Sequence, residues 1–141
     1  MGNEAGAGMN RQTGNAIDIL VVDDMTVSRQ ILTMLLEQAG FANVQTARAS
    51  LDAVDAIDRK MPGLIIADFH MPGMDGIEFL RCLRASPATR HIPFILTSAD
   101  DGNAKILQSW KSGSFQFLAK PFKAGDLITT VRAATGLAIA S

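Results

Sequence analysis

The sequence has a single cysteine, almost no excess of either charge and no long apolar run, and each shortage excludes a class of protein. Cys82 has no second cysteine with which to form an intramolecular disulfide, so we expect a reducing compartment, the cytoplasm. The basic and acidic residues number 13 and 14, which gives a formal net charge of -1. A protein with such balanced charges lacks the positive surface that binds the phosphate backbone of nucleic acids, so we expect no nucleic-acid partner.

No apolar stretch approaches the roughly 20 residues that span a bilayer, and the amino terminus lacks the charged-then-apolar order of a signal peptide. We therefore expect no membrane partner. The 141 residues fit one folded domain of ordinary size. Residues 1–16 are rich in glycine and asparagine without apolar periodicity, which predicts a disordered tail or a remnant of cloning. The folded domain is predicted over 17–136, with a short tail over 137–141.

From Ile17 onward, short apolar runs alternate with longer amphipathic segments. Strands are predicted at IDILVV, ANVQTA, GLIIA, IPFILT and FQFLA, and helices at about 26–39, 50–60, 75–85, 101–112 and 123–135. Because a strand is followed by a helix each time, the pattern predicts an α/β domain with a parallel sheet between two helical layers.

Three finer predictions concern the faces and ends of these helices. In the first helix the periodicity assigns the buried face to Val27, Ile31, Met34 and Leu35, and Gly40 ends the helix. Cys82 lies among apolar residues of the third helix, which indicates a small buried hydrophobe. Charged residues nearby are interpreted as a solvated face, namely Arg81, Arg84 and Arg90.

Polar residues stand where four of the predicted strands end. Asp23 and Asp24 follow the first strand, and Asp68 ends the third. Thr97 and Ser98 end the fourth, and Lys120 follows the fifth. In a doubly wound parallel sheet the carboxyl ends of the strands share one edge, so these side chains are predicted to converge there. A solvated turn acid is the simpler interpretation of Asp68 taken alone.

Three carboxylates set close together raise one another's pKa unless a cation holds them. Magnesium suits this set, because it prefers oxygen ligands and commonly binds one or two carboxylates together with phosphate oxygens. The spacing of His70 and His91 matches no zinc site. A lysine beside a metal and a carboxylate is suited to phosphoryl chemistry.

Four segments occur in the following order along the chain: Asp23-Asp24 after an apolar run, DFHMPGMDG beginning at Asp68, ILTS ending on Ser98, and LAKPF around Lys120. Together they resemble the receiver domain of two-component response regulators, over about residues 17–135. The resemblance implies a flavodoxin-like, doubly wound sheet of five parallel strands in the order 2-1-3-4-5, with five helices. No effector domain follows in this sequence, so it is similar to stand-alone receivers of the chemotaxis type, and we expect a monomer.

By this resemblance, Asp68 takes a phosphoryl group from the phosphohistidine of a sensor histidine kinase or a phosphotransfer protein. Asp24 binds Mg²⁺ directly, Asp23 mainly through water, and the backbone carbonyl of His70 completes the protein ligands. Lys120 pairs with the phosphoryl group, and the Thr97 hydroxyl acts as the switch. Such a protein is not an enzyme for other substrates, because it catalyses only its own phosphotransfer and autodephosphorylation.

Aromatic residues near the last strand suggest a surface for an unknown downstream protein. Phe117 occupies the family's aromatic switch position, although a core aromatic on a strand is an equal interpretation. Trp110 and Phe115 stand where the family commonly has small and polar residues. We predict that Trp110, Phe115 and Phe117 form one aromatic patch. The alternative is that Trp110 packs over its own helix.

Other functions fit these residues less well. Phosphatases of the haloacid dehalogenase type place a second aspartate two residues after the nucleophile, where this chain has His70. A flavin binder would hold a phosphate in its first loop, where Asp23 and Asp24 would repel it. The remaining alternative is a pseudo-receiver or a phosphate sink without a dedicated output target. The usual sign of a pseudo-receiver, a lost acid, threonine or lysine, is not found in this sequence.

Overall fold

The computed structural model of the protein describes residues 16–100, 102–111 and 113–137. The predicted tails, 1–16 and 137–141, therefore lie outside the described residues except for Ala16 and Leu137. The described strands are β1 (Ile19–Val22), β2 (Val44–Ala47), β3 (Leu64–Asp68), β4 (Phe94–Ser98) and β5 (Gln116–Ala119). They form one parallel sheet in the order β2-β1-β3-β4-β5, which confirms the predicted topology.

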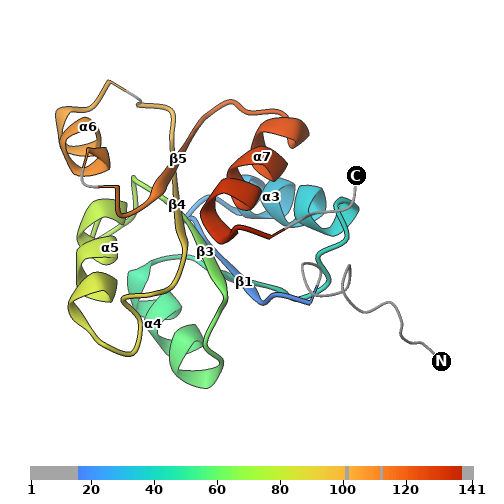
Figure 1. Ribbon diagram of the computed structural model, residues 1–141, viewed down its shortest axis with the longest axis horizontal. Helices are drawn as coiled ribbons and strands as arrows, with labels where there is room; N and C mark the ends of the chain where they lie inside the picture. Colours follow the sequence, from blue (N-terminus) through green and yellow to red (C-terminus); the bar gives the residue numbers. More distant parts are fainter. Residues whose placement is uncertain (1–15, 101, 112, 138–141) are drawn as a thin grey trace.

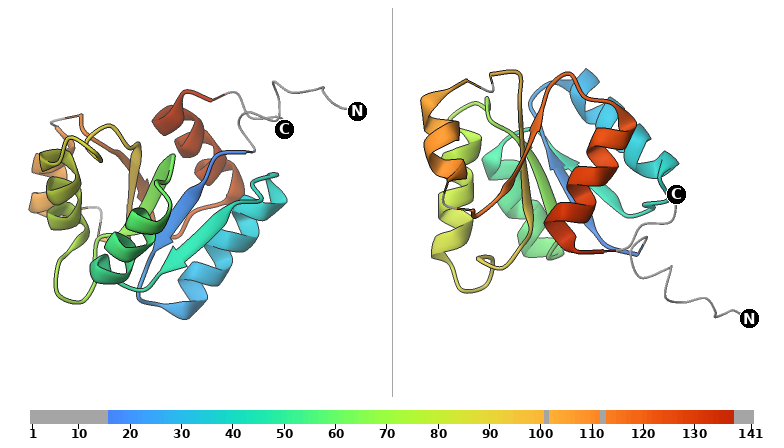
Figure 2. Two further views of the ribbon diagram at one scale, coloured as in Figure 1. Left: turned by 90° about the horizontal axis from the view of Figure 1, so that it is seen from below. Right: turned by 45° about the horizontal axis from the view of Figure 1, so that its top comes forward.

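Helices cover both faces of this sheet (Figures 1 and 2). The described helices are α3 (Thr26–Gln38), α4 (Ser50–Arg59), α5 (Gly76–Ala85), α6 (Ala104–Trp110) and α7 (Ala124–Thr135). Figure 1 shows α3 and α7 on one side of the strands and α4, α5 and α6 on the other. In the described part of the chain, every helix is too short or too polar to cross a membrane.

The core consists of two apolar layers, one on each face of the sheet. Side chains alternate along each strand, so Leu20 and Val22 join the layer beneath α4, α5 and α6, whereas Ile19 and Val21 join the layer beneath α3 and α7. Strands β1, β3 and β4 are buried at every position. Continuous apolar runs are typical of such central parallel strands, because helices cover both of their faces.

The predicted buried face of α3 is wrong for three of its four residues, whereas Leu35 is half-buried and packs against the core layer beneath α3 and α7. Leu32 and Leu36 are the buried residues of this helix, whereas Val27, Ile31 and Met34 are exposed. The apolar residues of α3 occupy an arc wider than the face that the sheet covers, so the periodicity fits more than one choice of buried face, and contact with the sheet selects one of them. Gly40 has a φ of 99°, a left-handed conformation that favours glycine just after a helix end, as predicted.

Cys82 and Arg84 also differ from the predictions. Cys82 is exposed, since the buried residues of α5 are Gly76, Ile77, Phe79, Leu80 and Leu83, and position 82 lies beyond the edge of that arc. Arg84 is not a fully solvated arginine. Its guanidinium donates hydrogen bonds to the carbonyls of Ile92 and Ser114, at 2.8 and 2.7 Å.

Side-chain caps fix where two helices begin. Asp75 accepts from the Glu78 amide while the Glu78 carboxylate accepts from the Asp75 amide, a capping box at the start of α5. Asn103 accepts from the amide of Lys105 at 2.9 Å, so α6 begins at Ala104, later than the predicted residue 101. Asp101 and Ser112, the predicted limits of that helix, lie outside the described residues.

Candidate functional site

The register of the sheet brings the predicted polar residues to one edge. Val22 of β1 pairs with Ala67 of β3, so the residues that follow them, Asp23 and Asp68, come side by side. Asp68 in turn pairs with Thr97 of the neighbouring strand β4. Lys120 follows β5, and its amide donates to the Ser98 carbonyl at 2.9 Å. Residues from distant parts of the sequence therefore meet where these strands end.

Lys120 bridges two of the three carboxylates. Its Nζ lies 3.1 Å from Asp23 Oδ2 and 3.2 Å from Asp68 Oδ1. Asp23 and Asp68 are buried and Asp24 is exposed, and oxygens of all three acids lie within 4.8 Å of one another. With the acids ionised, three carboxylates and one ammonium leave a charge of -2. A dication neutralises that charge, so this donor set fits magnesium.

Burial and neighbouring charges alter the protonation of this cluster. Burial raises the pKa of Asp68; Lys120 lowers it, the charge of Asp23 raises it further, and the net shift is upward. Burial lowers the pKa of Lys120, but attraction to Asp68 and hydrogen bonding to Asp23 outweigh this and raise it overall. The fold therefore favours the charged form of Lys120 and disfavours the charged form of Asp68.

Two hydroxyl groups stand at the end of β4, those of Thr97 and Ser98. The Thr97 hydroxyl is buried and lies 3.5 Å from Asp68 Oδ1, at the outer limit of a hydrogen bond. Ser98, the next residue, faces away from Asp68 in the alternation of β4, and its hydroxyl accepts from the Asp100 amide at 2.9 Å. Of the two hydroxyls predicted at this strand end, only Thr97 contacts the carboxylate.

Arg29, which the sequence analysis did not single out, fixes the first acidic loop. Its guanidinium donates to the backbone carbonyl of Asp23 at 2.7 Å, and the Asp23 carboxylate accepts from the Met25 amide at 2.9 Å. An arginine in the first turn of a helix interacts unfavourably with the helix dipole, so its presence there indicates a compensating local contact. That position is a sequence signal that could have identified Arg29.

The loop between β3 and α5 is held close to Asp68 by a glycine. A Cβ placed on Gly76 would lie 2.7 Å from the Asp68 carbonyl oxygen and 2.6 Å from a methyl carbon of Leu96. The Gly76 amide also donates to the Phe69 carbonyl at 2.8 Å. Only a residue without a side chain allows α5 to begin this near the strand end.

A cleft of about 700 Å³ opens above Asp68. Asp24, His70 and Lys120 are among the residues that line it. His70 is exposed, and its ring lies edge-on against Phe69 with the ring centroids 4.8 Å apart. The Asp68 carboxylate can therefore be reached by a ligand or a partner from this side.

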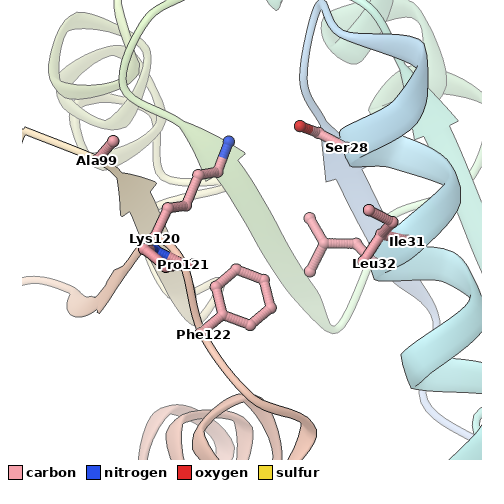
Figure 3. Close-up of a pocket in the computed structure, with 7 residues that line it drawn as sticks. All are labelled: Ser28, Ile31, Leu32, Ala99, Lys120, Pro121 and Phe122. Atoms are coloured by element: carbon pink, nitrogen blue, oxygen red, sulfur yellow. The ribbon is translucent and has the colours of Figure 1, made fainter.

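A second, apolar cavity of about 350 Å³ lies beside the first. Figure 3 shows Ile31 and Leu32 of α3 facing Phe122 across it, with Lys120 and Ala99 at its border. Lys120 and Ala99 line both hollows, so the apolar cavity is continuous with the edge of the carboxylate cleft.

The three aromatic residues near β5 do not form one surface. Trp110 is 43 % exposed, and its ring centroid lies 5.5 Å from that of the half-buried Phe117. Phe115 is 4 % exposed and belongs to the core layer beneath α5 and α6. The prediction of a shared aromatic patch is therefore wrong for Phe115, which the helices cover. The two remaining rings, those of the exposed Trp110 and the half-buried Phe117, form an aromatic pair.

Comparison with known families agrees with this geometry. The profile of the response regulator receiver domain family matches residues 19–132. The chain belongs to that family. A receiver domain is what the four segments at the strand ends predicted, and the match covers nearly all of the described residues.

Curated and solved relatives support the same placement of this receiver domain. The chain is 33 % identical over 109 residues to chemotaxis protein CheY-3 of Vibrio cholerae, covering 77 % of this chain and 84 % of that protein. The receiver domain of a signal transduction histidine kinase from Syntrophus aciditrophicus shares 31 % identity, with a TM-score of 0.77, over 86 % of this chain and 91 % of that one.

A third relative was solved with a metal. The receiver domain of sensor histidine kinase PA1611 from Pseudomonas aeruginosa has a TM-score of 0.76 and 26 % identity, over 86 % of this chain and 98 % of that one. That structure has a magnesium ion coordinated in its active-site cleft.

Proposed function

We propose that this receiver domain is a single-domain response regulator that is phosphorylated on Asp68. The observation that carries the proposal is the position of the Asp68 carboxylate. It lies at the end of a central strand, 3.2 Å from the Lys120 ammonium and 3.5 Å from the Thr97 hydroxyl, below an open cleft. The donor is the phosphohistidine of a sensor histidine kinase or a histidine phosphotransfer protein.

In the transfer step, an Asp68 carboxylate oxygen forms a bond to phosphorus while the bond from phosphorus to the donor imidazole nitrogen breaks. The nitrogen keeps the electron pair, and the product is an acyl phosphate on Asp68. Lys120 neutralises charge on the transferred oxygens from a position fixed by Asp23. This chain therefore contributes a fixed nucleophile and a fixed cation, the two elements that matter most in phosphoryl transfer.

We propose Mg²⁺ as the cofactor, held by the carboxylates of Asp24 and Asp68, by the His70 carbonyl and, mainly through water, by Asp23. The clustering of the three acids supports this assignment, as does the magnesium found in the related PA1611 receiver domain. When bound, the ion would offset the charge of the acids and of the phosphoryl oxygens.

The phosphoryl donor is proposed to dock on α3 beside the apolar cavity. Ile31 borders that cavity, and it is exposed together with three other apolar residues of the segment, Met25, Val27 and Met34. Because the cavity adjoins the cleft above Asp68, an apolar surface of the donor seated there would bring its histidine to the carboxylate. The Lys120 side chain extends along the edge of this cavity (Figure 3).

The output of the switch is proposed to pass from Thr97 through the half-buried Phe117 to the exposed Trp110. Phe117 pairs in the sheet with Leu96, the residue before Thr97, so a shift of β4 reaches it directly. A downstream protein would bind this altered surface. If phosphorylation left every partner contact unchanged, the chain would instead act as a phosphate sink.

Phosphorylation with a small phosphodonor tests the proposal. In the presence of magnesium the protein should gain one phosphoryl group that hydroxylamine removes, detected as a mass increase. Asp68→Asn should abolish the gain, and Asp75→Asn, which changes another acid bordering the same cleft, should retain it. A phosphoryl group that persists in Asp68→Asn would contradict the assignment of the acceptor.

A further inference from the structure

A second cleft, with different chemistry, lies between α5 and α6. These helices lie side by side on one face of the sheet (Figure 1). The cleft has a volume of about 600 Å³, within the range of roughly 300–1,000 Å³ that is typical of small-ligand sites. Its floor is formed by Ile77 and Leu80, and its polar lining includes Arg81, Arg84, Gln108 and Ser109. We call it the α5–α6 cleft.

The polar lining of the α5–α6 cleft is positively charged. Two guanidinium groups line it, and no carboxylate is found among its lining residues. Within the described part of the chain, neither Arg81 nor Arg84 forms an ion pair. Arginine is suited to bind oxyanions, because its planar guanidinium offers several donors in a fixed arrangement.

One of the two arginines is already held in place. Two carbonyl oxygens accept hydrogen bonds from Arg84, that of Ile92 at 2.8 Å and that of Ser114 at 2.7 Å. These neutral partners do not balance the charge, and burial lowers the pKa of Arg84. Arg81 reaches across the cleft, where its Nη2 lies 3.5 Å from the Ser109 hydroxyl oxygen. An anion bound here would find a cation whose position is already fixed, which reduces the entropy lost on binding.

We propose that the α5–α6 cleft binds a phosphate monoester with an apolar body. Two guanidinium charges match the charge of about -1.5 to -2 that a phosphate monoester carries at neutral pH. The Gln108 amide offers a further hydrogen bond, and Ile77 and Leu80 provide an apolar floor for the organic part. This site is separate from the Asp68 cleft, since the two share no lining residue.

A ligand titration tests the proposal in a protein whose Asp68 site cannot be phosphorylated or bind a metal. The Asp68→Asn protein is labelled with ¹⁵N and titrated with phenyl phosphate in EDTA, without magnesium. Amide signals of α5 and α6 should shift and saturate, whereas phenol should cause no saturable shift there. Inorganic phosphate should shift the same signals at higher concentration. Because Asp68 and the metal are both removed, failure of this test would leave the phosphorylation proposal untouched.

Matched arginine variants sharpen the test. Arg81→Gln should weaken phenyl phosphate binding about tenfold, the loss expected for one charge-assisted contact. Arg59→Gln removes the same charge from the exposed end of α4 and should leave the affinity unchanged. Equal weakening by both variants would overturn the proposal, because it would indicate general charge attraction. Saturable shifts confined to the strand ends, or tight binding of phenol, would also overturn it.

Arg84→Gln is a second variant, but it removes two hydrogen bonds to the backbone and is expected to lower stability. If this variant does not fold, Arg81→Gln still decides, because Arg81 is exposed and its loss leaves the core intact.

Discussion

Trp110 lies over Phe117, with ring centroids 5.5 Å apart and ring planes inclined at 49°. Trp110 is the single tryptophan of the chain, so the tryptophan emission comes from this one ring and its surroundings. We predict that beryllofluoride with magnesium, which mimics the phosphorylated state, shifts the Trp110 emission, because Thr97 and Phe117 rearrange beside its ring. Emission spectra recorded before and after addition measure the shift. The Asp68→Asn protein, which cannot hold the mimic, should show none.

Truncation of Trp110 should affect mainly binding, whereas truncation of Phe115 should affect mainly stability. Phe115→Ala removes a buried ring and should lower the free energy of unfolding by about 3–5 kcal/mol. Trp110→Ala removes a half-exposed ring, so its cost should be clearly smaller, while binding of the downstream protein weakens. Urea unfolding of both variants checks the comparison. If Trp110→Ala were as unstable as Phe115→Ala, the Trp110 ring would have to be counted as part of the core.

Magnesium should stabilise the unphosphorylated protein. Repulsion among Asp23, Asp24 and Asp68 is relieved when a cation binds, and a ligand at a hundred times its dissociation constant adds about 2.7 kcal/mol by mass action. Thermal unfolding in magnesium and in EDTA measures this gain. Asp24→Asn should lose most of it, and coincident curves for the native protein would exclude a metal site at this edge of the sheet.

The strand ends could be predicted from the sequence because the signal there is local. Each apolar run stops at a polar residue, and the rule that parallel strands end at one edge brings together residues as distant as Asp23 and Lys120. The Lys120 contacts with Asp23 and Asp68 in the structure follow from this rule without knowledge of any side-chain packing.

Features that depend on what covers a side chain could not be predicted in the same way. Phe115 lies directly before the edge strand β5 and Phe117 lies within it. Both rings pack on the same core layer, and only the position of α5 and α6 decides which ring is covered. The apolar arc of α3 is wider than the face that the sheet covers, so periodicity alone predicts a buried Ile31, which is 45 % exposed. The sequence does not show that Arg29 donates to the Asp23 carbonyl, because every residue has a backbone carbonyl; only the position of Arg29 near the start of α3 is visible in the sequence.

The raised pKa of Asp68 predicts a stability difference that depends on pH. In EDTA the ionised Asp68 is disfavoured by the fold, so the stability it contributes is complete below its ordinary pKa of 3.8 and is lost as pH rises through the folded-state value. Asn cannot ionise and avoids this loss. The advantage of Asp68→Asn over the native protein should therefore grow as pH rises, as measured by urea unfolding at fixed ionic strength.

Asp75 provides a control of opposite sign for the pH experiment. Burial raises the pKa of Asp75, but hydrogen bonds from Lys105 and from the Glu78 amide outweigh it, and the pKa is lowered. Its contribution to stability is present above pH 3.8 and disappears as pH falls through the lowered value. Asp75→Asn keeps a good helix cap yet should lose stability at neutral pH. If the stabilities of the two variants, each relative to the native protein, changed with pH in the same direction, the raised pKa assigned to Asp68 would be contradicted.

Replacement of Lys120 by Met should separate metal binding from signalling. Lys120 competes with a cation for Asp23 and Asp68, at 3.1 and 3.2 Å, so its loss should leave magnesium affinity unchanged or slightly increased. The phosphoryl group would then lack its ammonium partner, and the change would not pass to Trp110 and Phe117. We expect the Lys120→Met protein, phosphorylated by excess donor, to show neither the Trp110 emission shift nor tighter binding of a downstream protein.

Lys123→Met, which removes an exposed lysine three residues further on, should behave like the native protein. A normal emission shift in phosphorylated Lys120→Met would mean that this lysine only balances the charge of the resting carboxylates.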